Sequence, residues 1–142
     1  MKIEISSGGV VFKKNGRSFQ VLLLKDKNNF WSFPKGLIEK DEDKLTAAKR
    51  EIGEEINVKK LKMICELAPI HYFYKWESEI VNKTVYFFLF EELEEEKPVS
   101  QLEEGITEVK WFPLDEAIKI VGYPKTNKAV LEETKNKLKI EN

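Results

Sequence analysis

Three glutamates, Glu51, Glu54 and Glu55, lie close together in the segment KREIGEEINV, residues 49–58. We expect this segment near the C-terminal end of a helix, where carboxylates face the negative end of the helix dipole. Two carboxylates about 5 Å apart repel each other by roughly 3 kcal/mol at an effective dielectric of about 20. A divalent cation would remove this repulsion, and hard oxygen ligands suit Mg²⁺ or Mn²⁺.

The helix expected over residues 43–56 carries one narrow apolar stripe, at about 100° of rotation per residue. Glu51 and Glu55 border that stripe, whereas Glu54 lies further round the helix. Two of the three acids are therefore predicted at the edge of the core. The stripe itself consists of Leu45, Ala48, Ile52 and Ile56.

A simpler interpretation of the glutamates is a solvated, charged helix face. Arg50 can pair with Glu54 at the i, i+4 spacing, and most runs of charge do no more than this. The residues that precede the helix favour the metal site over this interpretation.

A fixed spacing of residues surrounds the three glutamates. Gly36 is followed by five residues, Glu42, seven residues, and then Arg50-Glu51-Ile52-x-Glu54-Glu55-x-Asn57-Val58. This pattern resembles the signature of the Nudix hydrolases, G-x5-E-x7-R-E-U-x-E-E-x-G-U, in which U is aliphatic. Every defined position matches except the last glycine, which is Asn57 here. Asparagine is the next best residue for the left-handed conformation that closes a helix.

The resemblance implies a role for each matching residue. Glu51, Glu54 and Glu55 would hold Mg²⁺ or Mn²⁺, and either Glu51 or Glu54 would deprotonate the attacking water. Arg50 would hold one of the glutamates, with Glu51 the expected partner, through a directional guanidinium–carboxylate bond. Glu42 would orient this network or bind the metal through water.

The segments around the signature narrow the substrate class. FWSFPKG, residues 30–36, directly precedes it, and the aromatic segments 70–74 and 82–90 follow it. Together they resemble the diadenosine tetraphosphate (Ap4A) hydrolases of animal and archaeal type, over most of residues 3–113. In these segments Gly36 would permit the backbone turn that brings the loop over the helix, and it is also expected to contact the substrate. The diphosphoinositol polyphosphate hydrolases share the W-x-F-P-K-G element, so they are the nearest competing substrate class.

A polyphosphate requires cations, and a purine requires a flat apolar surface. Lys35 and Lys83 are the lysines that we expect to bind phosphate, although either is equally well explained as an ordinary surface lysine. His71, the only histidine, is expected either to contact phosphate or to make a structural hydrogen bond. Tyr72 and Tyr74 lie on the strand face opposite His71. They are candidates for stacking on the base, with burial in the core as the alternative.

A further acid is expected to complete the metal site from the loop before the last strand, as the resemblance implies. The segment QLEEGITEVKW, residues 101–111, offers Glu103, Glu104 and Glu108. Glu104 is the predicted metal ligand, and a solvated loop acid is the alternative.

Strand-like and helical segments alternate along the chain. Several adjacent strands are too closely linked for parallel crossovers, which favours a mixed β-sheet with helices on its faces, an α/β (α+β) arrangement. The resemblance implies a Nudix-type α/β/α sandwich in a single domain of residues 1–142. The segment KKNG, residues 13–16, predicts a hairpin turn. A second helix should follow Pro113, and a third should cover residues 126–139 with Thr126 as its cap. Strands are predicted at residues 3–13, 19–25, 61–68, 70–76, 83–91 and 106–112.

The composition excludes several other classes of protein. The chain has 142 residues, 42% of them hydrophobic, which is enough for a core. A net charge of −1 gives no basic footprint for DNA. The longest apolar run, residues 85–90, is far shorter than the roughly 18 residues of a membrane span. The single cysteine, Cys65, excludes an internal disulfide, and we expect a cytoplasmic protein. We also expect a monomer or homodimer without DNA or membrane partners.

The resemblance implies Mg²⁺-dependent hydrolysis of a diphosphate linkage, in a nucleoside diphosphate joined to another group, by metal-activated water. The expected substrate is Ap4A, which would give ATP and AMP. The alternative substrates are diphosphoinositol polyphosphates and oxidised or non-standard nucleoside triphosphates. Two other classes stay open. One is a non-catalytic Nudix-fold binding module, although such modules often lose the glutamates. The other is an enzyme like isopentenyl-diphosphate isomerase, whose cysteine should precede the signature, whereas Cys65 follows it.

Overall fold

The computed structural model of the chain describes residues 1–140. Residues 141 and 142, which the expected domain includes, lie outside the described residues. The strands are β1 (Lys2–Asn15), β2 (Ser18–Lys25), β3 (Trp31–Ser32), β4 (Lys35–Leu37), β5 (Leu61–Glu66), β6 (Ile70–Trp76), β7 (Glu79–Glu92) and β8 (Glu108–Pro113). The helices are α1 (Lys44–Ile56), the short 3₁₀ helix η1 (Leu102–Glu104), α2 (Leu114–Ile120) and α3 (Pro124–Ile140).

All eight strands join one sheet in which β3, β2, β1, β7 and β5 are successive neighbours. Strand β4 pairs with β1, β6 pairs with β7, and β8 pairs with β2. The two long central strands β1 and β7 run parallel, and the other strand pairs are antiparallel. The expected mixed sheet is therefore confirmed, and the fold is of the α+β class.

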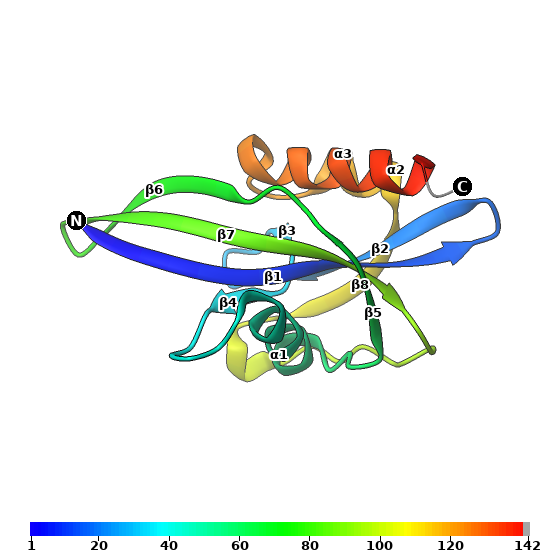
Figure 1. Cartoon of the computed structure of the whole chain (residues 1–142), viewed down its shortest axis with the longest axis horizontal. Helices are drawn as coiled ribbons and strands as arrows, with labels where there is room; N and C mark the ends of the chain where they lie inside the picture. The colour runs from blue at the N-terminus through cyan, green and yellow to red at the C-terminus, as the bar shows by residue number, and fades with distance from the viewer. Residues whose placement is uncertain (141–142) are drawn as a thin grey trace.

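Helices cover both faces of this sheet, with α1 on one side and α2 and α3 on the other (Figure 1). Because successive strand residues point to opposite faces, Val10 and Val11 of β1 enter different core clusters. Each fully buried aliphatic side chain stabilises the fold by about 1.5–3 kcal/mol relative to exposure. The cluster under α1 includes Val11, Ile52, Ile56, Phe88 and Phe90, and the cluster under α2 and α3 includes Val10, Phe12, Phe87, Leu114 and Leu131.

The sequence predicts the long elements better than the short ones. The bounds of β6 are as predicted, and the first hairpin turns at Gly16, whose φ of 66° suits glycine. The strands β3 and β4 were not predicted, because two or three residues show no periodicity.

The prediction that Thr126 caps the third helix is wrong. That helix begins at Pro124, since proline suits the first helical position, and Thr126 lies inside it.

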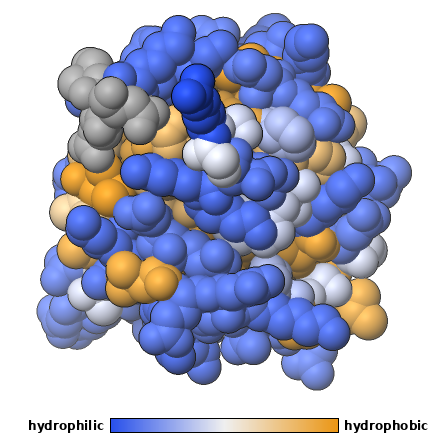
Figure 2. Space-filling model, turned by 90° about the vertical axis from the view of Figure 1, so that its right-hand side faces the viewer, coloured by the Kyte–Doolittle hydropathy of each residue, from blue (hydrophilic) through white to orange (hydrophobic). Residues whose placement is uncertain are grey.

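No helix in the described part of the chain is long and apolar enough to cross a membrane. Figure 2 shows the end of the molecule that carries the β1–β2 hairpin. This surface is mainly hydrophilic, and its hydrophobic residues form separate groups.

Both ends of α1 are closed by the side chain or backbone conformation of the flanking residue. At the N-terminus, a carboxylate oxygen of Asp43 accepts a 2.7 Å hydrogen bond from the backbone N–H of Thr46. At the C-terminus, Asn57 has the left-handed conformation expected at this position, with φ 57° and ψ 37°. Its N–H donates to the carbonyl oxygen of Gly53 at 3.0 Å.

We expect Asn57→Ala to lower the free energy of unfolding by about 1 kcal/mol, because alanine is strained in the left-handed region. Asn57→Gly should stay close to the wild type, since glycine adopts this conformation freely. Urea denaturation of the two variants measures the difference. Equal losses from both variants would contradict a backbone role and point to the asparagine side chain.

Candidate active site

Arg50, in α1, is the centre of a partly buried hydrogen-bond network. Its Nε and Nη2 donate to the two carboxylate oxygens of Glu42, at 2.7 and 2.9 Å. Its Nη1 donates to Glu51, the expected partner, at 2.7 Å and to Glu54 at 3.2 Å. Nη2 also donates to the carbonyl oxygen of Leu37 at 3.1 Å. One guanidinium group therefore orients three of the four signature glutamates and connects them to β4.

The pKa values of Glu42 and Glu51 are shifted in opposite directions, although both carboxylates bind Arg50. The hydrogen bond from Arg50, with a further bond from the N–H of Glu39, lowers the pKa of Glu42 to about 2. Glu42 is therefore a permanent carboxylate that orients Arg50. Burial raises the pKa of Glu51, and the bond from Arg50 only partly offsets this.

Glu55 is the acid with the largest upward shift at this site. Its carboxylate accepts a 3.1 Å hydrogen bond from the backbone N–H of Lys35. Burial first, and then the negative charges of Glu51 and Glu104, raise the pKa of Glu55 to about 8. The charge of Glu104, in η1, also raises the pKa of Glu51. Glu104, the predicted fourth acid, therefore lies within electrostatic reach of Glu51 and Glu55.

Gly36 lies beneath this network, in β4, where it pairs with Ser7 of β1. A Cβ atom on Gly36 would lie 2.2 Å from the carboxyl carbon of Glu51. The expectation that Gly36 permits a backbone turn is therefore wrong: the residue is part of a strand, and its φ is not positive. Glycine is needed here because the Glu51 carboxylate occupies the space of a side chain.

The acids have the right chemistry for a divalent cation but are not gathered into a complete site. In the part of the chain that the structure describes, no group of three or more His, Cys, Asp and Glu side chains could hold a metal ion. Instead, Arg50 binds the carboxylates of Glu51 and Glu54. The donor set nevertheless fits Mg²⁺ or Mn²⁺, because carboxylate oxygens are their preferred ligands. Burial first, and then neighbouring carboxylates, raise the pKa values of Glu51 and Glu55, and a cation bound beside them would favour their ionised forms.

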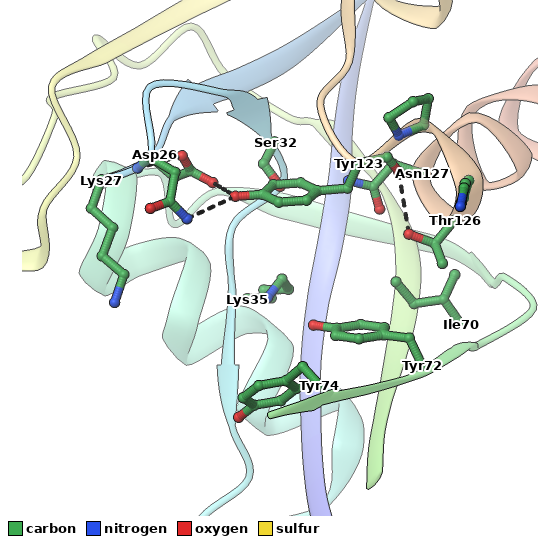
Figure 3. A pocket seen from close by; sticks show the side chains of 13 residues that line it. Asp26, Lys27, Ser32, Lys35, Ile70, Tyr72, Tyr74, Tyr123, Thr126 and Asn127 are labelled. Carbon is green, nitrogen blue, oxygen red and sulfur yellow. Dashed lines mark hydrogen bonds between the residues drawn. The ribbon is translucent and has the colours of Figure 1, made fainter. Parts of the chain in front are cut away.

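A cavity of about 710 Å³ lies on the sheet face opposite α1, between β6, the start of α3 and the β2–β3 loop (Figure 3). Lys35 connects the two sites, since its backbone N–H binds Glu55 and its side chain lines the cavity. The pKa of Lys35 is lowered by burial and by the charge of Lys83. The lining residues are Asp26, Lys27, Asn28, Ser32, Lys35, Ile70, Tyr72, Tyr74, Tyr123, Pro124, Lys125, Thr126 and Asn127.

The structure brings together some of the predicted substrate contacts and separates others. Lys35, Tyr72 and Tyr74 line the cavity. Lys83 is buried directly across from Tyr72 in the sheet, and its Nζ lies 3.3 Å from a carboxylate oxygen of Glu4. His71 does not line the cavity. It lies on the other face of β6, where its ring contacts the side chain of Asn82 and meets the ring of Phe73 in a T-shaped arrangement. Gly36 is likewise absent from the lining.

Sequence reasoning missed the opposite wall of the cavity, formed by Tyr123 and the residues that follow it. The hydroxyl group of Tyr123 donates to a carboxylate oxygen of Asp26 at 2.7 Å and accepts a bond from Asn28 at 3.1 Å. No short motif marks these residues. The available signal was a tyrosine immediately before Pro124, at the start of the last predicted helix.

We expect Gly36→Ala to displace the Glu51 carboxylate from Arg50, because the added methyl group would overlap it. The loss should be about 1–3 kcal/mol of unfolding free energy, as for other overpacked sites. Gly53→Ala is the matched control, since a Cβ atom there meets nothing closer than 3.7 Å and alanine favours a helix. Thermal unfolding of both variants tests this. A Gly36→Ala protein as stable as the wild type would contradict the steric role.

We expect the metal-free protein to lose stability as the pH rises from about 4.5 to about 8, because Glu55 ionises in the unfolded chain before it ionises in the fold. Glu55→Gln removes this loss and keeps an acceptor for the Lys35 N–H. Above pH 8, in EDTA, the variant should be more stable than the wild type by about 1–3 kcal/mol, a figure discounted for solvent relaxation.

Urea denaturation at several pH values measures this effect. The control is Glu54→Gln, whose side chain is 52% exposed and which should keep the pH dependence of the wild type. A Glu55→Gln protein that is less stable than the wild type at high pH would show instead that the carboxylate has a structural role.

Comparison with known proteins agrees with this geometry. The NUDIX domain family model matches residues 2–134. The chain is 41% identical over 59 residues to an RNA pyrophosphohydrolase of Pelagibacter ubique (strain HTCC1062), a match that covers 42% of this chain and 37% of that protein. It is 28% identical over 120 residues to Nudix hydrolase 7 of Arabidopsis thaliana, covering 80% of this chain and 40% of that one. The chain thus spans about two fifths of the length of these curated relatives.

A solved structure resembles nearly the whole chain. The crystal structure of a C. elegans Ap4A hydrolase binary complex superposes with a TM-score of 0.79 and 26% identity, covering 95% of this chain and 97% of that one. The expected Nudix α/β/α arrangement is therefore confirmed. With the family model matching residues 2–134, the chain belongs to the Nudix family.

Proposed function

We propose that this protein is a metal-dependent pyrophosphohydrolase that hydrolyses a diphosphate linkage in a nucleoside diphosphate joined to another group. One observation carries the proposal: Lys35 connects the partly buried glutamates Glu51 and Glu55, whose pKa values are raised, to a cavity of about 710 Å³. The volume is in the range of small-molecule sites. The names of two relatives, an RNA pyrophosphohydrolase and an Ap4A hydrolase, support the same class of reaction.

In this proposal Glu51, Glu54, Glu55 and Glu104 hold Mg²⁺ or Mn²⁺. The bound ion supplies a lower pKa for water and positive charge for the developing negative charge on the bridging oxygen. Either Glu51 or Glu54 accepts the proton of the attacking water.

The other polar residues of the site position these groups. Arg50 orients Glu51 and Glu54, and the ionised Glu42 holds Arg50 through its bidentate pair. The backbone N–H of Lys35 fixes Glu55, and its ammonium group in the cavity attracts the phosphate chain.

We propose Ap4A as the substrate, cleaved to ATP and AMP. The rings of Tyr72, Tyr74 and Tyr123 offer flat apolar surfaces for a base, and Lys27 and Lys125 add positive charge at the cavity. This aromatic lining favours a nucleotide over a diphosphoinositol polyphosphate, which has no planar ring. Lys83 contributes long-range positive charge, and His71 is left out because it lies on the other sheet face.

The experiment that tests the proposal is chromatography of the products from a panel of substrates with Mg²⁺, with Mn²⁺ and with EDTA. The panel contains Ap4A, nucleoside triphosphates, 8-oxo-dGTP, ADP-ribose and diphosphoinositol polyphosphates. We expect equal amounts of ATP and AMP from Ap4A, no turnover in EDTA, and a loss of about 100-fold or more in kcat for Glu55→Gln.

Glu132→Gln, an exposed change on α3, is the control and should keep full activity. A protein that cleaves no phosphoanhydride with either ion would contradict the proposal and favour a binding module. Preferential turnover of another member of the panel would correct the substrate and leave the reaction class in place.

A further inference from the structure

Tyr123 has an unusual backbone conformation. Its φ of 54° lies in the left-handed region, which a bulky residue rarely adopts. The first turn of α3 holds it there, because the carbonyl oxygen of Tyr123 accepts bonds from the N–H groups of Thr126 and Asn127 at 3.2 and 2.9 Å. The preceding Gly122 donates its N–H to the carbonyl oxygen of Trp31 at 2.7 Å. Strain that surrounding contacts maintain in this way is typical of functional sites.

The ring of Tyr123 is placed mainly by its hydroxyl group. The residue is 42% exposed, and its one aromatic neighbour among the described contacts, Phe30, is 50% exposed. The two rings meet edge to face with centroids 5.3 Å apart. So little burial leaves the ring free to turn into solvent, unless the bonds from Tyr123 to Asp26 and from Asn28 to Tyr123 hold it.

Both carboxylate oxygens of Asp26 accept hydrogen bonds from nearby groups. One of its carboxylate oxygens accepts the N–H groups of Asn28 and Phe30 at 2.9 and 3.1 Å, which shapes the β2–β3 loop. The other oxygen accepts the hydroxyl of Tyr123 at 2.7 Å. A hydrogen bond to a carboxylate is stronger than one between neutral groups. The negative charge also makes Asp26 unsuitable for contact with phosphate.

We propose that Asp26 is a positioning residue that fixes the ring of Tyr123 as a wall of the cavity, and thereby selects ligands that carry a planar base. Figure 3 shows this ring on one side of the cavity and the rings of Tyr72 and Tyr74 on the other, with Asp26 at the hydroxyl end of Tyr123. The inference rests on the proposed function, since it assumes that this cavity takes the nucleoside end of the substrate. It assigns the choice of ligand to a contact between residues that are 97 positions apart.

The test is the binding of AMP and of inorganic tripolyphosphate by calorimetry, in the presence of Mg²⁺. AMP contains no anhydride, so its binding does not depend on hydrolysis. Asp26→Asn keeps an oxygen for the two loop N–H groups but removes the charged acceptor of the Tyr123 hydroxyl. Tyr123→Phe removes that hydroxyl alone. Each change should raise the Kd for AMP by about 3- to 10-fold and leave the Kd for tripolyphosphate within about twofold.

The double variant separates positioning from two independent effects. Because both changes remove the hydrogen bond that the Tyr123 hydroxyl donates to the Asp26 carboxylate, the Asp26→Asn/Tyr123→Phe protein should bind AMP about as well as either single variant. With Ap4A, KM should rise more than kcat falls in all three. Asp115→Asn, which breaks an exposed pair with Lys135 on α2 and α3, is the matched control and should change neither ligand.

Three results would overturn the inference: losses that multiply in the double variant, equal losses for AMP and tripolyphosphate, or a Tyr123→Phe protein that binds AMP like the wild type. Any of these in a protein that cleaves Ap4A leaves the proposed function in place. Coupled losses of AMP binding in a protein that cleaves no anhydride would support the positioning role and contradict the hydrolase proposal.

Discussion

The guanidinium group of Arg50 is the interaction on which the acidic half of the site depends. Without it, the carboxylates of Glu51 and Glu54 on α1 and of Glu42, just before α1, would repel one another. Because Arg50 also binds the carbonyl oxygen of Leu37, it fixes α1 to β4 as well as the carboxylates to one another. Its planar fork matches the two oxygens of Glu42, which a lysine would not reproduce. The orientation of these carboxylates is therefore fixed by contacts within the folded chain.

Strand β4 separates two regions that need opposite charges. On the α1 side, burial raises the pKa values of Glu51 and Glu55. On the cavity side, burial and Lys83 lower the pKa of Lys35. A cation on one side and a phosphate chain on the other would relieve both penalties. A metal–polyphosphate complex, the ligand of the proposed reaction, would carry both charges.

The sequence predicts features that are repeated or local, and it does not predict contacts between distant segments. The apolar periodicity of α1 predicts that Glu51 and Glu55 lie at the edge of the core, because the spacing of apolar residues within one helix shows which of its faces is buried. The role of Gly36 could not be read in this way, since it depends on a carboxylate from another element. Tyr123 was missed for the same reason: its partner Asp26 lies in the other half of the chain. For His71, phosphate contact and a structural hydrogen bond were both open from the sequence, and the structure places its ring against Asn82, on the face of β6 away from the cavity.

The central strand β1 positions the acidic half of the site through both its backbone and a side chain. Its backbone pairs with β4 at Lys35 and Gly36, and the hydroxyl of Ser7 donates to the carbonyl oxygen of Lys44 at the start of α1, at 2.7 Å. The acids are therefore held by the sheet and α1. The position of the Tyr123 ring in the cavity wall depends instead on the β2–β3 loop and the start of α3. Neither segment bonds to Arg50. The sequences of loops vary more among related proteins than those of the helices and strands they connect. The part of the ligand that the cavity recognises can therefore change while the acids stay in place.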